Sequence, residues 1–91
     1  MWAVVVRESG DVDKIDASGD HLAANVAPRL REAPGFISAL WTSDGRGGTL
    51  SMLAFETEAA AIGAAGRVPG APRPPFMQFE SVGVYLVLAS A

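Results

Sequence analysis

The segment Gly83–Ser90 (GVYLVLAS), close to the end of the sequence, carries an apolar residue at almost every position. A strand that leaves one face in water normally alternates apolar and polar side chains. This segment does not alternate, so it is typical of a strand that is covered on both faces. The chain has 91 residues. We expect a single domain over residues 1–91, with few other elements to provide that cover.

The composition indicates a globular protein and excludes several classes of function. Apolar residues make up 49% of the chain, charged residues 19%, and the net charge is −3. This balance argues against disorder and against nucleic-acid binding, which needs clustered Lys and Arg. There is no basic amphipathic stripe and no apolar run long enough to span a membrane. The opening MWAVVV lacks the features of a signal peptide, so we expect a cytoplasmic protein without a membrane partner.

Metal and cofactor motifs are missing from the sequence. The chain has no cysteine, which excludes disulfide bonds and thiolate metal sites. Asp11 and Asp13 fit two positions of a calcium loop, but Asp16 stands where that loop needs Gly, and Leu22 where it needs Glu. The GRGG stretch at 45–48 joins two predicted strands and is no dinucleotide fingerprint. We therefore expect neither a metal nor a cofactor.

The first third of the chain predicts a strand followed by a helix. Residues 2–7 (WAVVVR) are rich in β-branched side chains and predict a short strand. Apolar residues then recur at helical steps, at Val12, Ile15, Leu22, Val26 and Leu30. Asp16 or Ser18 is the expected N-cap, and Pro34 with Gly35 ends the helix. Pro28 cannot donate a hydrogen bond to the Ala24 carbonyl, so we expect a kink there.

The rest of the chain predicts a hairpin, a second helix and a last strand. Residues 36–43 and 49–56 read as strands joined by the turn 44–48. Thr57 is expected to cap a helix over 58–67, whose apolar side is mainly Ile62. The four prolines of 68–75 predict a loop, either a plain connection or a lid over a pocket. The last strand is expected over about 76–88, with a bulge at Gly83.

The order β-α-β-β-α-β predicts an α+β, ferredoxin-like sandwich: a four-stranded antiparallel sheet with both helices on one face. In the second strand, Phe36 and Leu40 are expected on one side and Ile37 and Trp41 on the other. The last strand is apolar on two sides as well, with Val82, Val84, Leu86 and Leu88 on one and Met77, Phe79, Tyr85 and Val87 on the other. Soluble monomers rarely expose so apolar a face. A second copy is the simplest cover, so we expect a homodimer paired through the sheets.

This layout resembles the dimeric α/β-barrel superfamily, and within it the antibiotic-biosynthesis-monooxygenase-like domains. The matching features are PGF at 34–36, the glycine-rich hairpin, and FETEA at 55–59, which leads into the second helix. The resemblance implies a barrel-forming homodimer with a pocket between the sheet and the helices of each subunit. The superfamily includes cofactor-independent monooxygenases of polycyclic aromatic substrates, haem-degrading enzymes, isomerases and proteins without known activity. The first-strand Asn and the second-helix His of the haem-degrading members have no counterpart here.

His21, Asn25 and Arg29 recur every four residues and form one stripe on the first helix, about 100° from the apolar stripe. A solvated helix face explains this pattern. The alternative places His21 and Asn25 at the rim of the pocket, where His21 would be a catalytic candidate because imidazole can move a proton near neutral pH.

Aromatic residues are the other pocket candidates. The hairpin turn predicts cross-strand pairs Ser43–Thr49, Trp41–Ser51, Ala39–Leu53 and Ile37–Phe55. A large ring beside small neighbours leaves room for a flat cavity next to Trp41. Core or dimer-interface packing is the alternative reading for Trp41, Phe55 and Tyr85.

The sequence contains no convincing set of paired carboxylates, hydrolase triad or phosphate loop. Cofactor-independent oxidation of a small aromatic or polyketide-like substrate suits such a chain, since the substrate supplies the electrons and the protein only desolvates it and helps remove a proton. The alternative is a non-catalytic ligand-binding or stress-associated dimer. An open, aromatic-walled cavity with a polar group reaching in favours the first reading, and a cavity filled by Met52, Ile62 and Leu22 favours the second.

Overall fold

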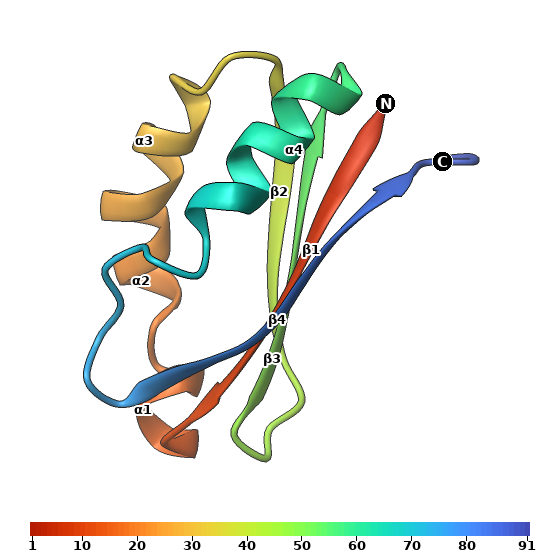
Figure 1. Cartoon of the computed structure of the whole chain (residues 1–91). Helices are drawn as coiled ribbons and strands as arrows, with labels where there is room; N and C mark the ends of the chain where they lie inside the picture. Colours follow the sequence, from red (N-terminus) through yellow and green to blue (C-terminus); the bar gives the residue numbers. More distant parts are fainter.

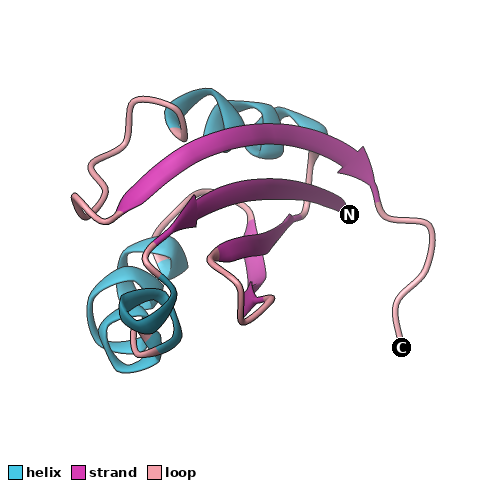
Figure 2. Cartoon of the chain, turned by 90° about the horizontal axis from the view of Figure 1, so that it is seen from below, coloured by secondary structure: helices cyan, strands magenta, loops and turns pink.

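The computed structural model describes all 91 residues and contains one four-stranded antiparallel sheet. The strands β1 (Trp2–Gly10), β2 (Phe36–Ser43), β3 (Gly48–Phe55) and β4 (Met77–Leu86) lie in the order β2-β3-β1-β4. Both helical segments cover the same side of this sheet (Figure 1), and the strands are visibly curved (Figure 2). This arrangement confirms the predicted α+β, ferredoxin-like fold. None of the helices is long and apolar enough to cross a membrane.

The first helical segment is broken into α1 (Val12–Asp16), α2 (Gly19–His21), the π-helical turn η1 (Leu22–Val26) and α3 (Ala27–Arg31). Its N-cap is Asp11, whose Oδ1 accepts a hydrogen bond from the Lys14 backbone N–H at 3.0 Å. Of the two predicted N-caps, Ser18 occupies the N-cap position of α2 without a capping hydrogen bond, and Asp16 lies inside α1, so neither caps the start of the segment. The helix begins earlier because a side-chain acceptor is already present before its first turn.

The kink expected at Pro28 takes the form of this π-helical turn. The backbone N–H of Ala27 bonds to the Leu22 carbonyl, five residues back. In a regular α-helix the proline ring would collide with the carbonyl of Ala24, four residues before it. A wider turn just before Pro28 relieves that collision and keeps the helical segment continuous.

The β2–β3 hairpin confirms three of the predicted cross-strand pairs: Ser43–Thr49, Trp41–Ser51 and Ala39–Leu53. The fourth pair was wrong, because a bulge between Phe36 and Ser38 places Phe36 opposite Phe55. The two rings meet edge to face, 5.9 Å apart. Phe36 therefore packs on the core side with Trp41, opposite to the side predicted for it, and Ile37 is exposed.

The hairpin turn is pinned to the end of β1 at Gly47. Its φ of +88° suits glycine, and a Cβ there would lie 2.7 Å from the Gly10 carbonyl oxygen. The same two residues form a backbone hydrogen bond of 2.8 Å. Close backbone contact thus fixes where the hairpin leaves the sheet.

Helix α4 (Glu58–Arg67) matches the predicted range, and the Thr57 hydroxyl accepts a hydrogen bond from the Ala60 N–H at 3.1 Å, as a cap should. The prediction for its apolar side was wrong. Ala61 and Ala65 face the sheet and are buried, whereas Ile62 points outward. Small side chains on the inner face let the helix approach the strands closely.

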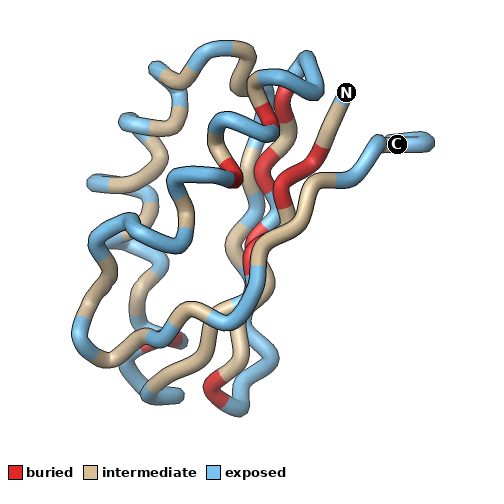
Figure 3. The backbone as a smooth tube through the Cα atoms, in the orientation of Figure 1, coloured by how far each residue is buried: buried red, intermediate tan, exposed pale blue.

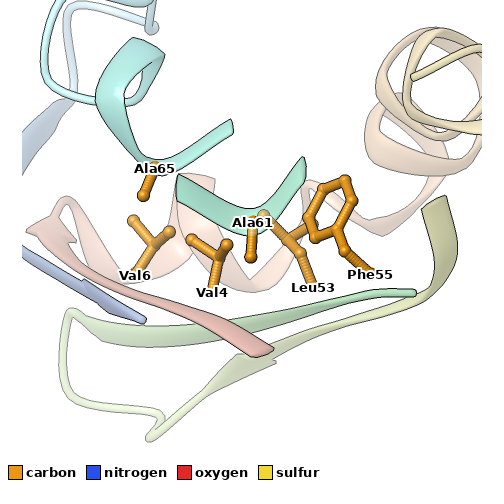
Figure 4. Packing of buried hydrophobic residues seen from close by; sticks show 6 residues of the cluster. All are labelled: Val4, Val6, Leu53, Phe55, Ala61 and Ala65. Atoms are coloured by element: carbon orange, nitrogen blue, oxygen red, sulfur yellow. The ribbon is translucent and has the colours of Figure 1, made fainter. Parts of the chain in front are cut away.

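The hydrophobic core lies under α4. Ala61 and Ala65 point down onto side chains of β1 and β3, as Figure 4 shows, and together they form the cluster Val4, Val6, Leu53, Phe55, Ala61 and Ala65. Figure 3 shows that most buried positions gather around these strands and α4. Only 10 of 91 residues are buried, so a single chain provides a small core.

Strand β4 carries its bulge at Glu80, not at Gly83. Arg7 of β1 lies opposite Ser81, while the next residue, Glu8, lies opposite Phe79. The extra residue reverses the facing of everything before it. Met77 and Phe79 therefore lie on the helix side of the sheet, and the prediction that grouped them with Tyr85 was wrong.

The opposite face of the sheet has no helix over it and is strongly apolar. Leu40 is 67% exposed, Met52 43% and Tyr85 58%. The Tyr85 ring lies next to Gly83, where a Cβ would come within 2.8 Å of the ring. Glycine at this position thus leaves the space that the ring occupies.

Candidate ligand-binding cavity

A cavity of about 690 Å³ lies between the first helical segment, the sheet and the loop 68–76. Its floor comes from the sheet side that carries Val6, Trp41, Ser51 and Leu53. Ser51 lies directly opposite Trp41, so a small side chain beside a large ring leaves open space. This volume lies within the range of small-molecule sites.

The helical wall of the cavity includes His21, Leu22 and Val26. In a regular α-helix, His21 and Val26, five residues apart, would point about 140° away from each other. The π-helical turn between them accommodates a five-residue repeat, which lets both side chains border the same cavity. Asn25 and Arg29, expected on one stripe with His21, do not line it.

Asn25 instead contacts the histidine from outside the cavity. The Asn25 Nδ2 atom lies 3.2 Å from His21 Nδ1, and both side chains are exposed. An amide nitrogen can only donate, so in this pair Nδ1 is the acceptor and Nε2 carries the hydrogen. The imidazole thus keeps one N–H that is not engaged by Asn25.

The third wall is the proline-rich loop, which is held in place by Arg73. Arg73 Nε pairs with the Glu8 carboxylate at 2.8 Å, and its two terminal nitrogens donate to the carbonyls of Val68 and Pro69 at 2.8 and 3.2 Å. Its guanidinium also lies 5.4 Å from the Phe79 ring centre. One side chain therefore ties the loop to β1, to β4 and to the end of α4.

Phe76 closes the loop wall near α1. Its carbonyl accepts the Asp11 backbone N–H at 3.1 Å, and the Lys14 ammonium lies 5.8 Å from its ring centre. Lys14 and Phe76 both line the cavity. The loop thus adds an aromatic surface and a nearby cation to the apolar floor.

A second, smaller cavity of about 370 Å³ adjoins the first. Ser18, Leu22, Trp41 and Ser51 border both cavities. The smaller one is more polar and includes the hydrogen-bonded pair Asp16 and Ser43. Trp41 therefore stands between an apolar and a polar compartment.

The structure brings together two of the five predicted pocket residues, His21 and Trp41. Phe55 is only 1% exposed and belongs to the core under α4. Tyr85 lies on the uncovered face of the sheet, and Asn25 lies outside the cavity.

Reading the sequence did not find the charged residues of the cavity, Glu8, Lys14 and Arg73, or its second aromatic residue, Phe76. The sequence feature that could have pointed to the loop wall is Arg73, because it is the only charged residue in the proline-rich loop. Met52, Ile62 and Leu22 were considered as residues that would fill the cavity. Met52 and Ile62 are exposed on other surfaces, and only Leu22 borders the cavity. No cluster of three or more potential ligands for a metal ion occurs among the His, Asp and Glu residues.

Comparison with known proteins finds similarity in structure only. No protein-family model matches the chain, and no curated protein matches its sequence. A monooxygenase from the ActVA-Orf6 gene of Streptomyces coelicolor, solved with the ligand nanaomycin D, matches with a TM-score of 0.63 at 17% identity, over 99% of this chain and 89% of that one. The haem degrader MhuD of Mycobacterium tuberculosis, solved with two haems in its active site, matches with a TM-score of 0.61 at 15% identity, over 100% and 99%. The chain therefore shares the ferredoxin-like α+β fold of these two proteins.

Proposed function

We propose that this protein is a homodimer that binds a small aromatic or polyketide-like molecule in the cavity of each subunit and oxidises it with molecular oxygen, without a cofactor. The observation that carries the proposal is the open cavity of about 690 Å³, with the Trp41 ring at its floor and His21 in its wall. The two structural matches were solved with nanaomycin D and with haems, both of which are aromatic ligands.

The cavity suits a flat, apolar ligand because rings can stack on Trp41 and Phe76 and displace water from the surrounding apolar surface. The small Ser51 beside Trp41 provides the space for such a ring. The loop held by Arg73 separates this space from bulk water on a third side. Exclusion of water favours a reaction in which the substrate itself reduces oxygen.

His21 would act on the oxygen substituent of the ligand. Its Nε2–H is not engaged by Asn25 and can donate to a phenol or ketone oxygen, which stabilises the electron-rich anion that forms when the substrate loses a proton to solvent water. That anion transfers electrons to O2. For an anthrone, the ring CH2 gains one oxygen atom and becomes a ketone, and the second oxygen atom leaves as water. The protein needs no redox centre for this balance.

The test is oxygen uptake with 1-naphthol and anthrone as probes, against a protein-free control, with products identified by mass spectrometry. Wild type should consume oxygen and yield the quinone. Ser51→Phe should fill the cavity and abolish both binding and uptake. His21→Ala should lower turnover about a hundredfold while binding persists. Ile62→Phe, on the outer surface of α4, is the matched control and should behave as wild type. Uptake equal in Ser51→Phe and wild type would contradict the proposal.

A non-catalytic role is the second candidate, and one observation favours it. Because Asn25 occupies His21 Nδ1 and the other nitrogen carries the hydrogen, the imidazole has no free base atom in this structure. Binding of the probes, blocked by Ser51→Phe but without any oxygen uptake, would assign the protein to ligand binding alone.

The dimer is supported by the uncovered sheet face. Leu40, Met52 and Tyr85 expose apolar surface on this face, and its contact with water is unfavourable. A second copy of the chain, paired through the same face, would bury this surface. Sedimentation velocity should give about twice the single-chain mass of 9.4 kDa. Leu40→Glu should yield monomers, whereas Ile62→Glu, a similarly exposed apolar position on α4, should remain dimeric. A wild-type monomer at micromolar concentration would refute the dimer.

A further inference from the structure

The charged groups of the main cavity are not balanced. Glu8, Lys14 and Arg73 line it, which gives one carboxylate against two cations, while the whole chain carries a net charge of −3. Positive charge is therefore concentrated in this cavity against the overall sign of the protein.

Arg73 and Glu8 satisfy each other. Their ion pair is the only one in the structure, and the side chains are just 20% and 18% exposed. All three nitrogens of the guanidinium are already used, one by Glu8 and two by loop carbonyls. Arg73 and Glu8 thus neutralise each other while Arg73 holds the loop, and neither charge is left without a partner.

Lys14 is the cation that remains. Its side chain is exposed, and its ammonium group forms neither an ion pair nor a hydrogen bond within the chain and lies 5.8 Å from the centre of the Phe76 ring. Asp11, the N-cap of the same helix, accepts the Lys14 backbone N–H through its Oδ1 atom and forms no ion pair with the ammonium. A flexible side chain with three free donors thus stands at the aromatic edge of the cavity.

We infer that Lys14 selects ligands that carry a carboxylate, so that the substrate class is an aromatic acid: the rings lie on Trp41 and Phe76, and the carboxylate pairs with the Lys14 ammonium. This inference rests on the proposed function, because it names the ligand class of the same cavity. A neutral ligand of equal shape would stack on the same rings but leave the ammonium without an anion. The carboxylate gains a charge-assisted hydrogen bond that the neutral group cannot provide.

The test compares 2-naphthoate with its neutral isostere 2-naphthamide by isothermal titration calorimetry at low ionic strength. Wild type should bind naphthoate about fivefold more tightly than naphthamide, the scale expected for a partly exposed ion pair. Lys14→Gln should remove this preference without weakening naphthamide binding, and Lys14→Arg should keep it. Arg31→Gln removes a cation from α3 that does not line the cavity and should leave the preference intact.

The outcomes separate the two proposals. If neither probe binds, both the ligand class and the proposed cavity function fail. If both probes bind equally, or if Lys14→Gln keeps the preference for naphthoate, the role of Lys14 is overturned while the aromatic-binding cavity stands. Loss of the preference in Arg31→Gln as well would also overturn the inference, since it would attribute the effect to overall charge.

Discussion

The two halves of the helical layer use the same side of the sheet in opposite ways. Under α4, alanines pack directly onto the strands, and Val4 and Phe55 are at most 1% exposed. Under the first helical segment the space is open: no residue of α2, η1 or α3 is buried, and a cavity of about 690 Å³ remains. Figure 3 shows the same division, with buried positions clustered near α4.

The difference lies in the side chains that each helix turns inward. Ala61 and Ala65 let α4 approach the sheet, whereas the first segment presents long side chains such as Leu22 and Leu30 at the cavity wall. Close packing stabilises the fold through dispersion contacts. A cavity lacks those contacts but leaves space in which a ligand can bind. The half under α4 therefore holds the packed core, and the half under the first helical segment holds the cavity.

The largest effect should come from truncating a side chain in the filled half. Phe55→Ala should lower the free energy of unfolding by about 3–5 kcal/mol, because it leaves a void in a packed cluster. Leu22→Ala, at the wall of the existing cavity, should cost only about 1 kcal/mol. Urea denaturation followed by circular dichroism at fixed protein concentration measures both. Equal losses would show that the two halves do not differ in packing.

Enlarging a small residue in each half gives the complementary test. Ala61→Leu should destabilise the fold by about 1–3 kcal/mol, since the site has no room for added atoms. Ser51→Leu adds its bulk to the cavity and should leave stability nearly unchanged while probe binding falls. Thermal unfolding and calorimetry separate these effects. A destabilised Ser51→Leu protein would contradict the open cavity.

The loop wall should respond to loss of Arg73. Arg73→Met removes one ion pair and two hydrogen bonds to loop carbonyls and leaves the Glu8 carboxylate partly buried without a partner, so it should cost about 1–3 kcal/mol. Limited proteolysis should then cut within residues 68–76 sooner than in wild type. Arg67→Met, at the exposed end of α4, is the control and should resist as wild type does.

The smallest effect should lie in the hairpin turn, outside both halves. Backbone N–H groups of Arg46 and Gly48 donate to the Asp44 carboxylate and hold its pKa below the usual range. A lowered pKa in the folded state stabilises the protein above the unfolded-state pKa, and this contribution is lost as the pH falls below about 4. Asp44→Ala should therefore show a slightly shallower acid-induced loss of stability than wild type. An unchanged pH dependence would contradict the role of Asp44.

The element order and most of the register could be predicted because turn chemistry and apolar periodicity are local. The hairpin around Gly45 and Gly47 fixed the pairs from Ser43–Thr49 to Ala39–Leu53. Within the hairpin only the predicted pair Ile37–Phe55 was wrong, because a bulge places Phe36 opposite Phe55 and lets the two rings meet. A bulge of this kind is decided by packing against residues distant in sequence, which no local pattern records.

The candidate site was harder to predict for the same reason. An aromatic residue on the helix side of a strand suits a core and a cavity equally, so Phe55 and Trp41 could not be told apart before the helices above them were known. For Tyr85, the bulge at Glu80 decided the outcome, because a regular β4 would have placed it on one side with Phe79. Arg73 and Phe76 line the cavity because of the course of the loop backbone, and a proline-rich sequence does not predict that course.

The wide turn before Pro28 has a consequence for how this cavity could diversify. Such a turn holds one residue more than an α-helical turn needs, and Pro28 requires it, because regular winding would return the proline ring to the Ala24 carbonyl. Replacement of Pro28 together with deletion of Ala23 would restore regular winding. Everything on the N-terminal side would then rotate by about 100° relative to α3, and a different side chain would replace His21 at the wall. Two changes outside the lining positions are therefore enough to exchange the polar group offered to the ligand.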